Sequence, residues 1–263
     1  MYEFDYAKAA SLEDAAKRLG KEDAKLVAGG MTLLPTLKLR LAKPSELIDL
    51  GALANLKGIS EDGNAVVIGA MTRHADVNRS DVVKRVIPSL AAMAGMIGDP
   101  AVRNRGTIGG SIANNDPAAD YPGAVVALNA TVRTNKREIA ADNFFTGMFE
   151  TALEPDEIVT AVRFPKPDVG NYQKFRNPAS RYAIVGVYVA KTGGNVRVAV
   201  TGAGPVVFRV PEMEAALAKS FAPDAIKDIA IKDDGLNSDI HASAEYRAHL
   251  VNVMARRAVQ ACA

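Results

Sequence analysis

Two glycine pairs constrain the fold and the ligand of this chain more than any other feature. Gly29-Gly30 and Gly109-Gly110 are each followed by a hydroxyl residue, Thr32 and Ser111 respectively. Paired glycines favour a turn, and they let a backbone approach a ligand closely because no side chain intervenes. A helical pattern begins after the first pair, and the unpaired N–H groups at a helix start favour a phosphate. The sequence leaves two interpretations open, a phosphate cradle or two simple turns.

Neither pair belongs to a common nucleotide-binding motif. The chain contains no GxGxxG, no GxxxxGK[ST] and no GxSxG, which excludes a Rossmann fingerprint, a P-loop and a hydrolase nucleophile elbow. Cys262 is the only cysteine, so this chain alone cannot form a zinc ribbon, a CxxC redox pair or a thiolate-bound iron–sulfur cluster. The three histidines lie far apart in sequence. We therefore expect no metal site and no catalytic triad.

Charge and hydropathy exclude further classes of protein. Lys and Arg number 32 against 30 Asp and Glu, a net charge of +2, which is too small for a nucleic-acid or membrane-coating surface. No segment approaches the ~20 apolar residues of a membrane span. Residues 1–6 lack the basic and apolar regions of a signal peptide. These features predict a soluble intracellular protein.

The apolar periodicity predicts two regions of different architecture. In the first, helices alternate with short strands: helices at 9–19 (N-cap Ser11), 31–41, 89–97 and 122–128, and strands at 24–28, 46–50, 65–71, 131–137 and 157–164. The segment 165–170 carries two prolines and a glycine, which predicts a domain boundary. Beyond it we expect a three-stranded meander and three helices: strands at 172–176, 182–191 and 195–202, and helices at 211–219, 223–231 and 243–261.

An Asn- and Asp-rich loop, residues 113–120, follows the second glycine pair. Asp120 is a natural N-cap for the helix that begins near Pro122. A carboxylate beside a phosphate cradle would also suit the hydroxyl groups of a ribose or ribityl chain. The sequence does not choose between these two roles.

The two glycine motifs, taken together, carry a family resemblance. Residues 28–35 with 38–40 resemble the first flavin-diphosphate motif of molybdenum hydroxylase flavoproteins, and residues 107–111 with 116–120 resemble the second. The resemblance continues through 153–159, 172–175, 180–183 and 245–258. The chain is thus similar to the FAD-binding medium subunits of the carbon monoxide dehydrogenase and xanthine dehydrogenase type.

This resemblance implies an α+β fold of two domains. Residues 1–168 would form a two-part FAD-binding domain of the vanillyl-alcohol-oxidase (PCMH) type, with subdomains at about 1–55 and 56–168. Residues 169–263 would form the smaller C-terminal domain, with a three-stranded antiparallel sheet and three helices.

The resemblance also implies a set of FAD-binding residues. The two motifs would hold the diphosphate, Asp120 would bind an FAD hydroxyl, Lys174 would approach the flavin ring and Tyr182 would stand beside the isoalloxazine. The motif residues are Ala28, Gly29, Gly30, Met31, Thr32, Leu33, Thr107, Ile108, Gly109, Gly110 and Ser111. Ser111 and Met31 depart from the family pattern, in which asparagine and a polar residue are usual.

The implied function is electron transfer within a multi-subunit molybdenum hydroxylase. A large partner would hold the molybdenum–pterin site and a small partner two [2Fe–2S] clusters. This chain would pass electrons through FAD to an external acceptor, a quinone or NAD. The resemblance suggests a cytoplasmic dimer of heterotrimers and leaves open a peripheral association with the inner face of the membrane. Two alternatives remain, a stand-alone FAD-dependent oxidoreductase of the same fold and a flavin-free assembly subunit.

Overall fold

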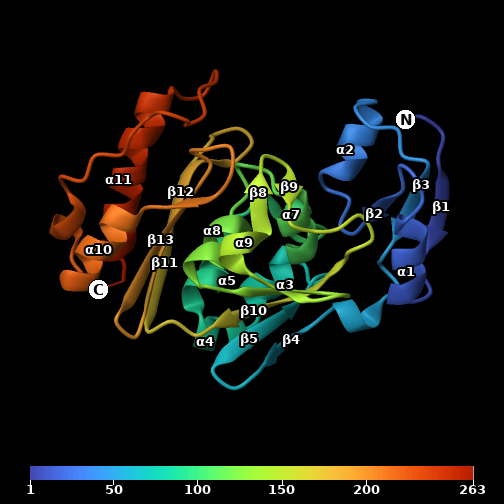
Figure 1. Ribbon diagram of the computed structural model, residues 1–263, viewed down its shortest axis with the longest axis horizontal. Coiled ribbons are helices and arrows are strands. Elements are labelled where there is room, and N and C mark those ends of the chain that lie inside the picture. The colour runs from blue at the N-terminus through green and yellow to red at the C-terminus, as the bar shows by residue number, and fades with distance from the viewer. Residues whose placement is uncertain (263) are drawn as a thin grey trace.

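In the computed structural model, which describes residues 1–262, a small parallel sheet opens the chain (Figure 1). Its strands are β1 (Asp5–Lys8), β2 (Lys25–Val27) and β3 (Glu46–Asp49), in the order β1-β3-β2. The helices α1 (Leu12–Leu19) and α2 (Leu33–Lys38) belong to this unit, and the Ser11 hydroxyl caps α1 by accepting from the Asp14 N–H at 3.1 Å. β1 was not predicted because three of its four residues are exposed and no apolar run marks it.

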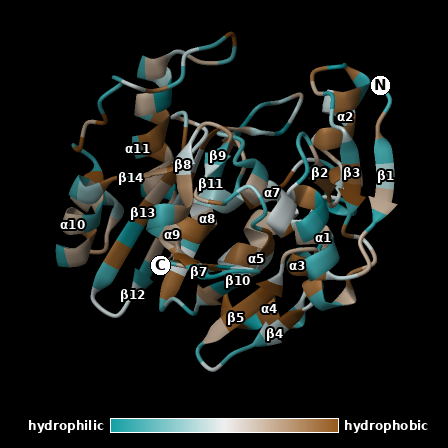
Figure 2. Ribbon diagram, turned by 45° about the vertical axis from the view of Figure 1, so that its right-hand side comes forward, coloured by the Kyte–Doolittle hydropathy of each residue, from teal (hydrophilic) through white to brown (hydrophobic). Residues whose placement is uncertain are grey.

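The middle unit is a five-stranded antiparallel sheet covered by helices. The strand order is β4-β5-β10-β6-β7, with β4 (Ile59–Glu61), β5 (Ala65–Gly69), β6 (Thr131–Thr134), β7 (Glu138–Ala140) and β10 (Val159–Pro165). Its helices are α3 (His74–Arg79), α4 (Asp81–Val86), α5 (Pro88–Gly95), α6 (Pro100–Arg103), α7 (Ile108–Asn114), α8 (Tyr121–Ala127) and α9 (Ala141–Phe144). Hydrophobic residues are concentrated on α4, α5 and β5, as Figure 2 shows. A short turn, η1 (Ala54–Leu56), and a hairpin of β8 (Phe145–Gly147) and β9 (Glu150–Thr151) complete the unit.

The C-terminal unit is an antiparallel sheet with helices on one face. Its strands follow in chain order: β11 (Val169–Arg176), β12 (Ala183–Thr192), β13 (Asn195–Thr201) and the two-residue β14 (Phe208–Arg209). The predicted meander is confirmed, with β14 added at its edge. α10 (Pro211–Lys219) and α11 (Ala244–Gln260) lie against the sheet (Figure 1).

The predicted helix at 223–231 is wrong beyond its first turn. Only a 3₁₀ turn, η2 (Pro223–Ile226), forms there. The side-chain amide of Asn252, on α11, donates to the carbonyl oxygens of Ile226 and Ile229 at 2.8 and 2.9 Å. These carbonyl groups are therefore satisfied from outside the segment, and a continued helix is not needed to pair them.

β12 is buried on both faces. Val185, Val187 and Val189 pack in the core beneath α10 and α11. Tyr188 and Ala190, on the opposite face, belong to the core of the middle unit. The Tyr188 hydroxyl lies 2.6 Å from the Ser89 hydroxyl of α5. This double coverage explains why the strand is almost continuously apolar in sequence. Within residues 1–262, no helix combines the length and apolarity that a membrane span requires.

Candidate functional site

The two glycine pairs lie on the wall of one cavity of about 520 Å³, to which all three units contribute. The loop between β2 and α2, the start of α7 and the loop between β11 and β12 meet there. Twelve of the fourteen predicted site residues line the cavity: Ala28, Gly29, Gly30, Met31, Thr32, Leu33, Thr107, Gly109, Gly110, Ser111, Asp120 and Tyr182. Ile108, which is fully buried, and Lys174 do not line it.

The first glycine pair brings the two loops into contact. A Cβ atom at Gly29 would lie 2.2 Å from the Arg105 carbonyl oxygen and 2.8 Å from the Gly106 Cα. Only glycine permits this approach. Gly30 has a φ of +73°, a conformation that other residues rarely adopt. The chain can therefore turn from β2 into α2 directly against the segment that precedes α7.

The first loop also provides unpaired hydrogen-bond donors. Within residues 1–262, the backbone N–H groups of Gly29, Gly30, Met31 and Thr32 donate to no protein acceptor. Four consecutive free N–H groups on a cavity wall form a site for an anion, and a diphosphate has the oxygen atoms to accept from them. This is the feature of the cavity that fits FAD most directly.

The second glycine pair differs from the predicted turn because it lies in the first turn of α7, with Thr107 as N-cap. Its N–H groups are already paired within the protein: Ile108 with Thr72, Gly109 with Ala70, and Gly110 and Ser111 with Thr107. A Cβ atom at Gly109 would lie 2.5 Å from the Ala70 Cβ. The glycine pair thus forms a part of the wall without side chains. The next residue, Ser111, adds a hydroxyl group to this part of the cavity.

Asp120 is not the side-chain cap that the sequence allowed. It precedes α8 in a helical conformation, and its carboxylate caps no N–H group. Instead it accepts from the Tyr172 hydroxyl at 2.5 Å and from the Lys174 ammonium at 2.9 Å. Burial raises the pKa of Asp120, and the charge of Lys174 opposes that rise. The side chain of Lys174 is only 2% exposed. It does not line the cavity itself but contacts Asp120, which does.

Tyr182 lies in the loop before β12 rather than at the start of the strand. The side chain of Asn177 fixes this loop by accepting from the N–H groups of Ala179 and Ser180 at 2.9 and 3.0 Å. Arg181 has a φ of +63°. The Tyr182 residue remains 46% exposed, and partial burial of its ring raises the pKa of the phenol.

Several cavity residues were not predicted from the sequence, and three of them are described here. His74 is buried, and its Nδ1 has no partner within residues 1–262; burial, with a smaller effect of Arg103, lowers the pKa of His74 to about 4. Asp116 and Phe149 also line the cavity. The position of Asp116 in the Asn- and Asp-rich loop was a signal for it. His74 and Phe149 stand in segments with no motif.

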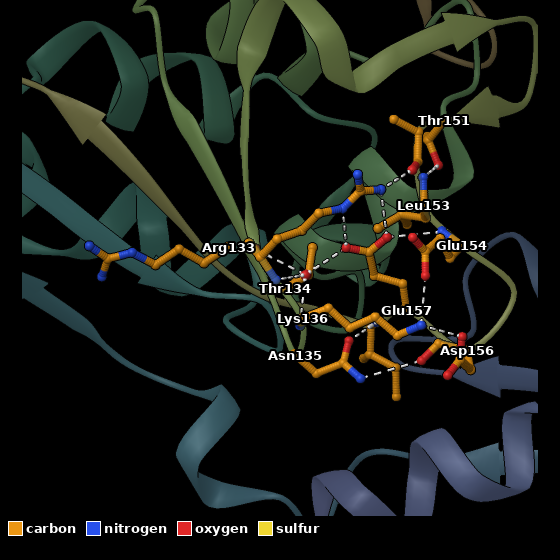
Figure 3. Close-up of polar contacts among 12 residues, drawn as sticks. Arg133, Thr134, Asn135, Lys136, Thr151, Leu153, Glu154, Asp156 and Glu157 are labelled. Carbon is orange, nitrogen blue, oxygen red and sulfur yellow. Dashed lines mark hydrogen bonds and ion pairs between the residues drawn. The ribbon is translucent and has the colours of Figure 1, made fainter.

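A polar network supports another part of the wall, formed by Ile158 and Val159 (Figure 3). The residue before them, Glu157, has a side chain with no exposed surface. Its carboxylate accepts from Arg137 twice at 3.0 Å, from Thr134 at 2.7 Å and from the Glu154 N–H at 2.9 Å. The hydrogen bonds from Arg137 contribute most to lowering the pKa of Glu157 to about 2. The turn between β6 and β7 thereby holds the loop that leads into β10.

Comparisons with known proteins agree with this geometry. Residues 2–167 match the family of the FAD binding domain in molybdopterin dehydrogenase, and residues 170–262 match the CO dehydrogenase flavoprotein C-terminal domain. The nicotine 6-hydroxylase medium subunit of Paenarthrobacter nicotinovorans is 39% identical over 97% of this chain and 95% of its own length. The carbon monoxide dehydrogenase medium chain of Hydrogenophaga pseudoflava is 37% identical over 98% and 96%.

Solved structures give the same result. Carbon monoxide dehydrogenase from Hydrogenophaga pseudoflava, in a form lacking the Mo-pyranopterin moiety, superposes with a TM-score of 0.88 at 35% identity, over 99% of this chain and 97% of that chain. Quinoline 2-oxidoreductase from Pseudomonas putida 86 gives a TM-score of 0.89 at 29% identity, over 99% and 97%. With both domain families matched in order along the chain, this protein belongs to the FAD-binding medium subunits of molybdenum hydroxylases, of the carbon monoxide dehydrogenase type.

Proposed function

We propose that this chain carries FAD as the electron-transfer subunit of a multi-subunit molybdenum hydroxylase. A small partner subunit with [2Fe–2S] clusters supplies the electrons, and a large partner holds the molybdenum–pterin site. Bound FAD supplies the redox chemistry and delivers the electrons to an external acceptor. The single cysteine, Cys262, supports the division of labour, since this chain lacks the thiolates that clusters need.

The observation that carries the proposal is the row of four free N–H groups, residues 29–32, on a cavity built by three units. The N–H groups of residues 29–32 would hold the FAD diphosphate, and the wall at Gly109 and Gly110 would leave space for it. Asp120 accepts from an FAD hydroxyl and is oriented by Lys174 and Tyr172. Tyr182, on the part of the wall that the loop before β12 contributes, would stand beside the isoalloxazine.

The proposal extends to domain organisation and assembly. Residues 1–168 act as the FAD-binding domain, with subdomains at about 1–55 and 56–168, and residues 169–263 as the C-terminal domain. The family relationship supports a cytoplasmic complex, organised as a dimer of heterotrimers.

A pair of glycine variants tests the cofactor site. Gly110 is exposed on the cavity wall, and its Cβ would approach the Thr107 hydroxyl at 3.0 Å, whereas a Cβ at Gly194 would meet nothing within 4 Å. We expect Gly110→Val to give folded protein with little FAD, and Gly194→Val to keep the full complement. FAD per chain is measured by visible absorption, and folding of both by circular dichroism. Full FAD loading of Gly110→Val would exclude the second glycine pair from the cofactor site.

Co-expression with candidate partners tests the assembly. Co-purification of this chain with a large and a small subunit, together with bleaching of its flavin by the substrate of the large subunit, is the expected result. A flavin-loaded chain that binds no partner would be a stand-alone oxidoreductase. A chain that binds partners without flavin would be an assembly subunit.

A further inference from the structure

The N-terminal unit is attached to the rest of the protein by few contacts. A single stretch of chain, residues 57–58, connects it to the middle unit, and Figure 1 shows it as a body of its own, drawn in blue. Within the part of the chain that the structure describes, no backbone hydrogen bond and no ion pair joins residues 1–53 to residues 58–262. We infer that residues 1–56 form a jaw that swings open to admit FAD and is held closed by the bound cofactor. The inference rests on the proposed function, because FAD is the ligand that closes the jaw.

The C-terminal unit is attached to the middle unit much more firmly. The two units share one hydrophobic core. The Tyr188 hydroxyl lies 2.6 Å from the Ser89 hydroxyl. The Thr201 hydroxyl lies 3.0 and 2.6 Å from the carbonyl oxygens of Pro117 and Ala119. These two units therefore act as one body, against which the jaw can move.

The jaw has a small core of its own. Seven of the nine buried residues of that core lie between Ala9 and Leu56, and the other two, Met71 and Ile158, come from the middle unit. The Met71 N–H donates to the Leu56 carbonyl oxygen at 2.8 Å. The jaw thus stays folded around its own core and rests on the middle unit close to the connecting chain.

The connecting chain has the properties of a hinge. Gly58 belongs to the middle unit, because the Thr72 hydroxyl pairs with both its N–H and its carbonyl oxygen at 3.0 Å. Its φ is +114°, and a Cβ atom there would meet nothing within 4 Å. Lys57, just before it, is exposed. Hinges are a few loop residues of this kind that absorb a change in φ and ψ while the bodies on either side stay rigid.

The jaw also meets the middle unit at the first glycine pair. The Gly29 backbone packs so closely against Arg105 and Gly106 that a Cβ atom would overlap both, yet no hydrogen bond forms there. The side chains of Thr32 and Tyr182 approach each other across the same boundary, but both residues are exposed, so water competes for their hydroxyl groups. Without a ligand, little free energy opposes opening at this contact.

FAD would supply the polar contacts that the boundary lacks. The four free N–H groups for its diphosphate, residues 29–32, lie on the jaw, whereas Asp120 and Ser111 lie on the cavity wall of the middle unit. A ligand that binds both walls does so only when the jaw is closed. Because a ligand favours the state to which it binds more tightly, FAD shifts the population toward the closed jaw.

Distances between spin labels test the inference directly. Cys262 is the only cysteine, so Cys262→Ser gives a background in which labels attach only at chosen sites. Lys17 and Lys43 lie on the jaw and Arg79 lies on α3 of the middle unit; all three are exposed, and none forms an ion pair within residues 1–262. Each pair of these positions is changed to cysteine and labelled, and FAD loading is checked by visible absorption.

Double electron–electron resonance then compares FAD-free and FAD-loaded protein. We expect the distances 17–79 and 43–79, which cross the boundary, to be broadly distributed without FAD and to collapse to one narrow distribution with it. The distance 17–43, within the jaw, should be narrow and unchanged in both. The two crossing pairs are independent, so either one is sufficient should the other fail to load FAD.

Gly29→Ala separates closure from folding. The added Cβ would lie 2.2 Å from the Arg105 carbonyl oxygen, a contact that only the closed jaw makes. The crossing distances should therefore stay broad at an FAD concentration that saturates the unmodified chain, while the distance 17–43 stays narrow. If the closed population falls to about a tenth, the apparent Kd for FAD rises about tenfold. Gly194→Ala, whose Cβ would meet nothing within 4 Å, should behave as the unmodified chain.

The outcomes separate this inference from the proposed function. Absence of FAD binding by the unmodified chain would overturn both. Normal FAD binding with crossing distances that FAD does not change, or a folded Gly29→Ala variant that closes as the unmodified chain does, would overturn the jaw and leave the flavin function intact.

Discussion

Glu157→Gln is the substitution that should reveal how the cavity wall is held (Figure 3). The change keeps the size of the side chain and removes its charge. A pKa lowered from 4.5 to about 2 corresponds to about 3 kcal/mol of stability if counted in full. Arg137 is 46% exposed, so screening by water reduces this contribution to about 1.5 kcal/mol. The Gln amide also turns an NH₂ group toward donors, which adds about 1 kcal/mol. We expect a total loss of roughly 2–3 kcal/mol.

Glu154→Gln is the matched control. Glu154 has a 52% exposed side chain and pairs with Lys136 at 2.7 Å, and exposed pairs of this kind contribute less than about 1 kcal/mol. Urea unfolding of both variants and of the unmodified chain, monitored by circular dichroism, gives the free energy of unfolding. Equal losses for the two variants would refute the role of the buried carboxylate.

The pH dependence gives an independent check. The folded-state pKa of Glu157 is lowered, so its charge contribution is fully present above about pH 4.5 and is lost as the pH falls toward 2. The difference between the unmodified chain and Glu157→Gln should therefore shrink between pH 7 and about pH 3, where less than half of the charge contribution remains. A difference that is the same at both pH values would contradict the assigned cause.

Three further substitutions have defined outcomes. Gly29→Ala places a Cβ 2.2 Å from the Arg105 carbonyl oxygen, so thermal unfolding should show a lower Tm and visible absorption less FAD than in Gly194→Ala. Asp120→Ala leaves the ammonium of Lys174 buried without its partner; urea unfolding of the apo protein should show a loss of about 3 kcal/mol, well above the ~1 kcal/mol expected of a lost cap. Tyr182→Ala should retain FAD, because the free N–H groups lie elsewhere, but should shift the flavin spectrum and change the rate of flavin reoxidation in stopped-flow traces. An unchanged spectrum together with an unchanged rate would assign Tyr182 a purely structural role.

The sequence predicted the elements that carry a local signal, such as helical spacing, a capping residue, an apolar run or a hairpin turn. α1 with its Ser11 cap and the β12–β13 hairpin follow from local patterns. β1 was missed because three of its four residues are exposed. The helix predicted at 223–231 was too long, because Asn252, distant in sequence, pairs with the carbonyl groups of Ile226 and Ile229. Pairing with distant residues cannot be read from local periodicity.

The residues of the candidate site were likewise predicted where the signal is local and missed where it depends on distant residues. The glycine pairs were visible because a missing side chain is a local property of the sequence. The partners of Asp120 were not, since Tyr172 and Lys174 come from β11, more than fifty residues away. His74 and Phe149 reach the cavity only through the packing of α3 and the β8–β9 hairpin.

The burial of β12 on both faces bears on how the chain can be divided. Tyr172, Tyr188, Ala190 and Ala199 lie beyond the boundary near residue 168, yet they complete the core of the middle unit. A fragment ending at that boundary would expose this core to water and lose the hydrophobic free energy that the strands supply. The two matched families are thus separate in sequence but share one core, so we expect them to unfold together.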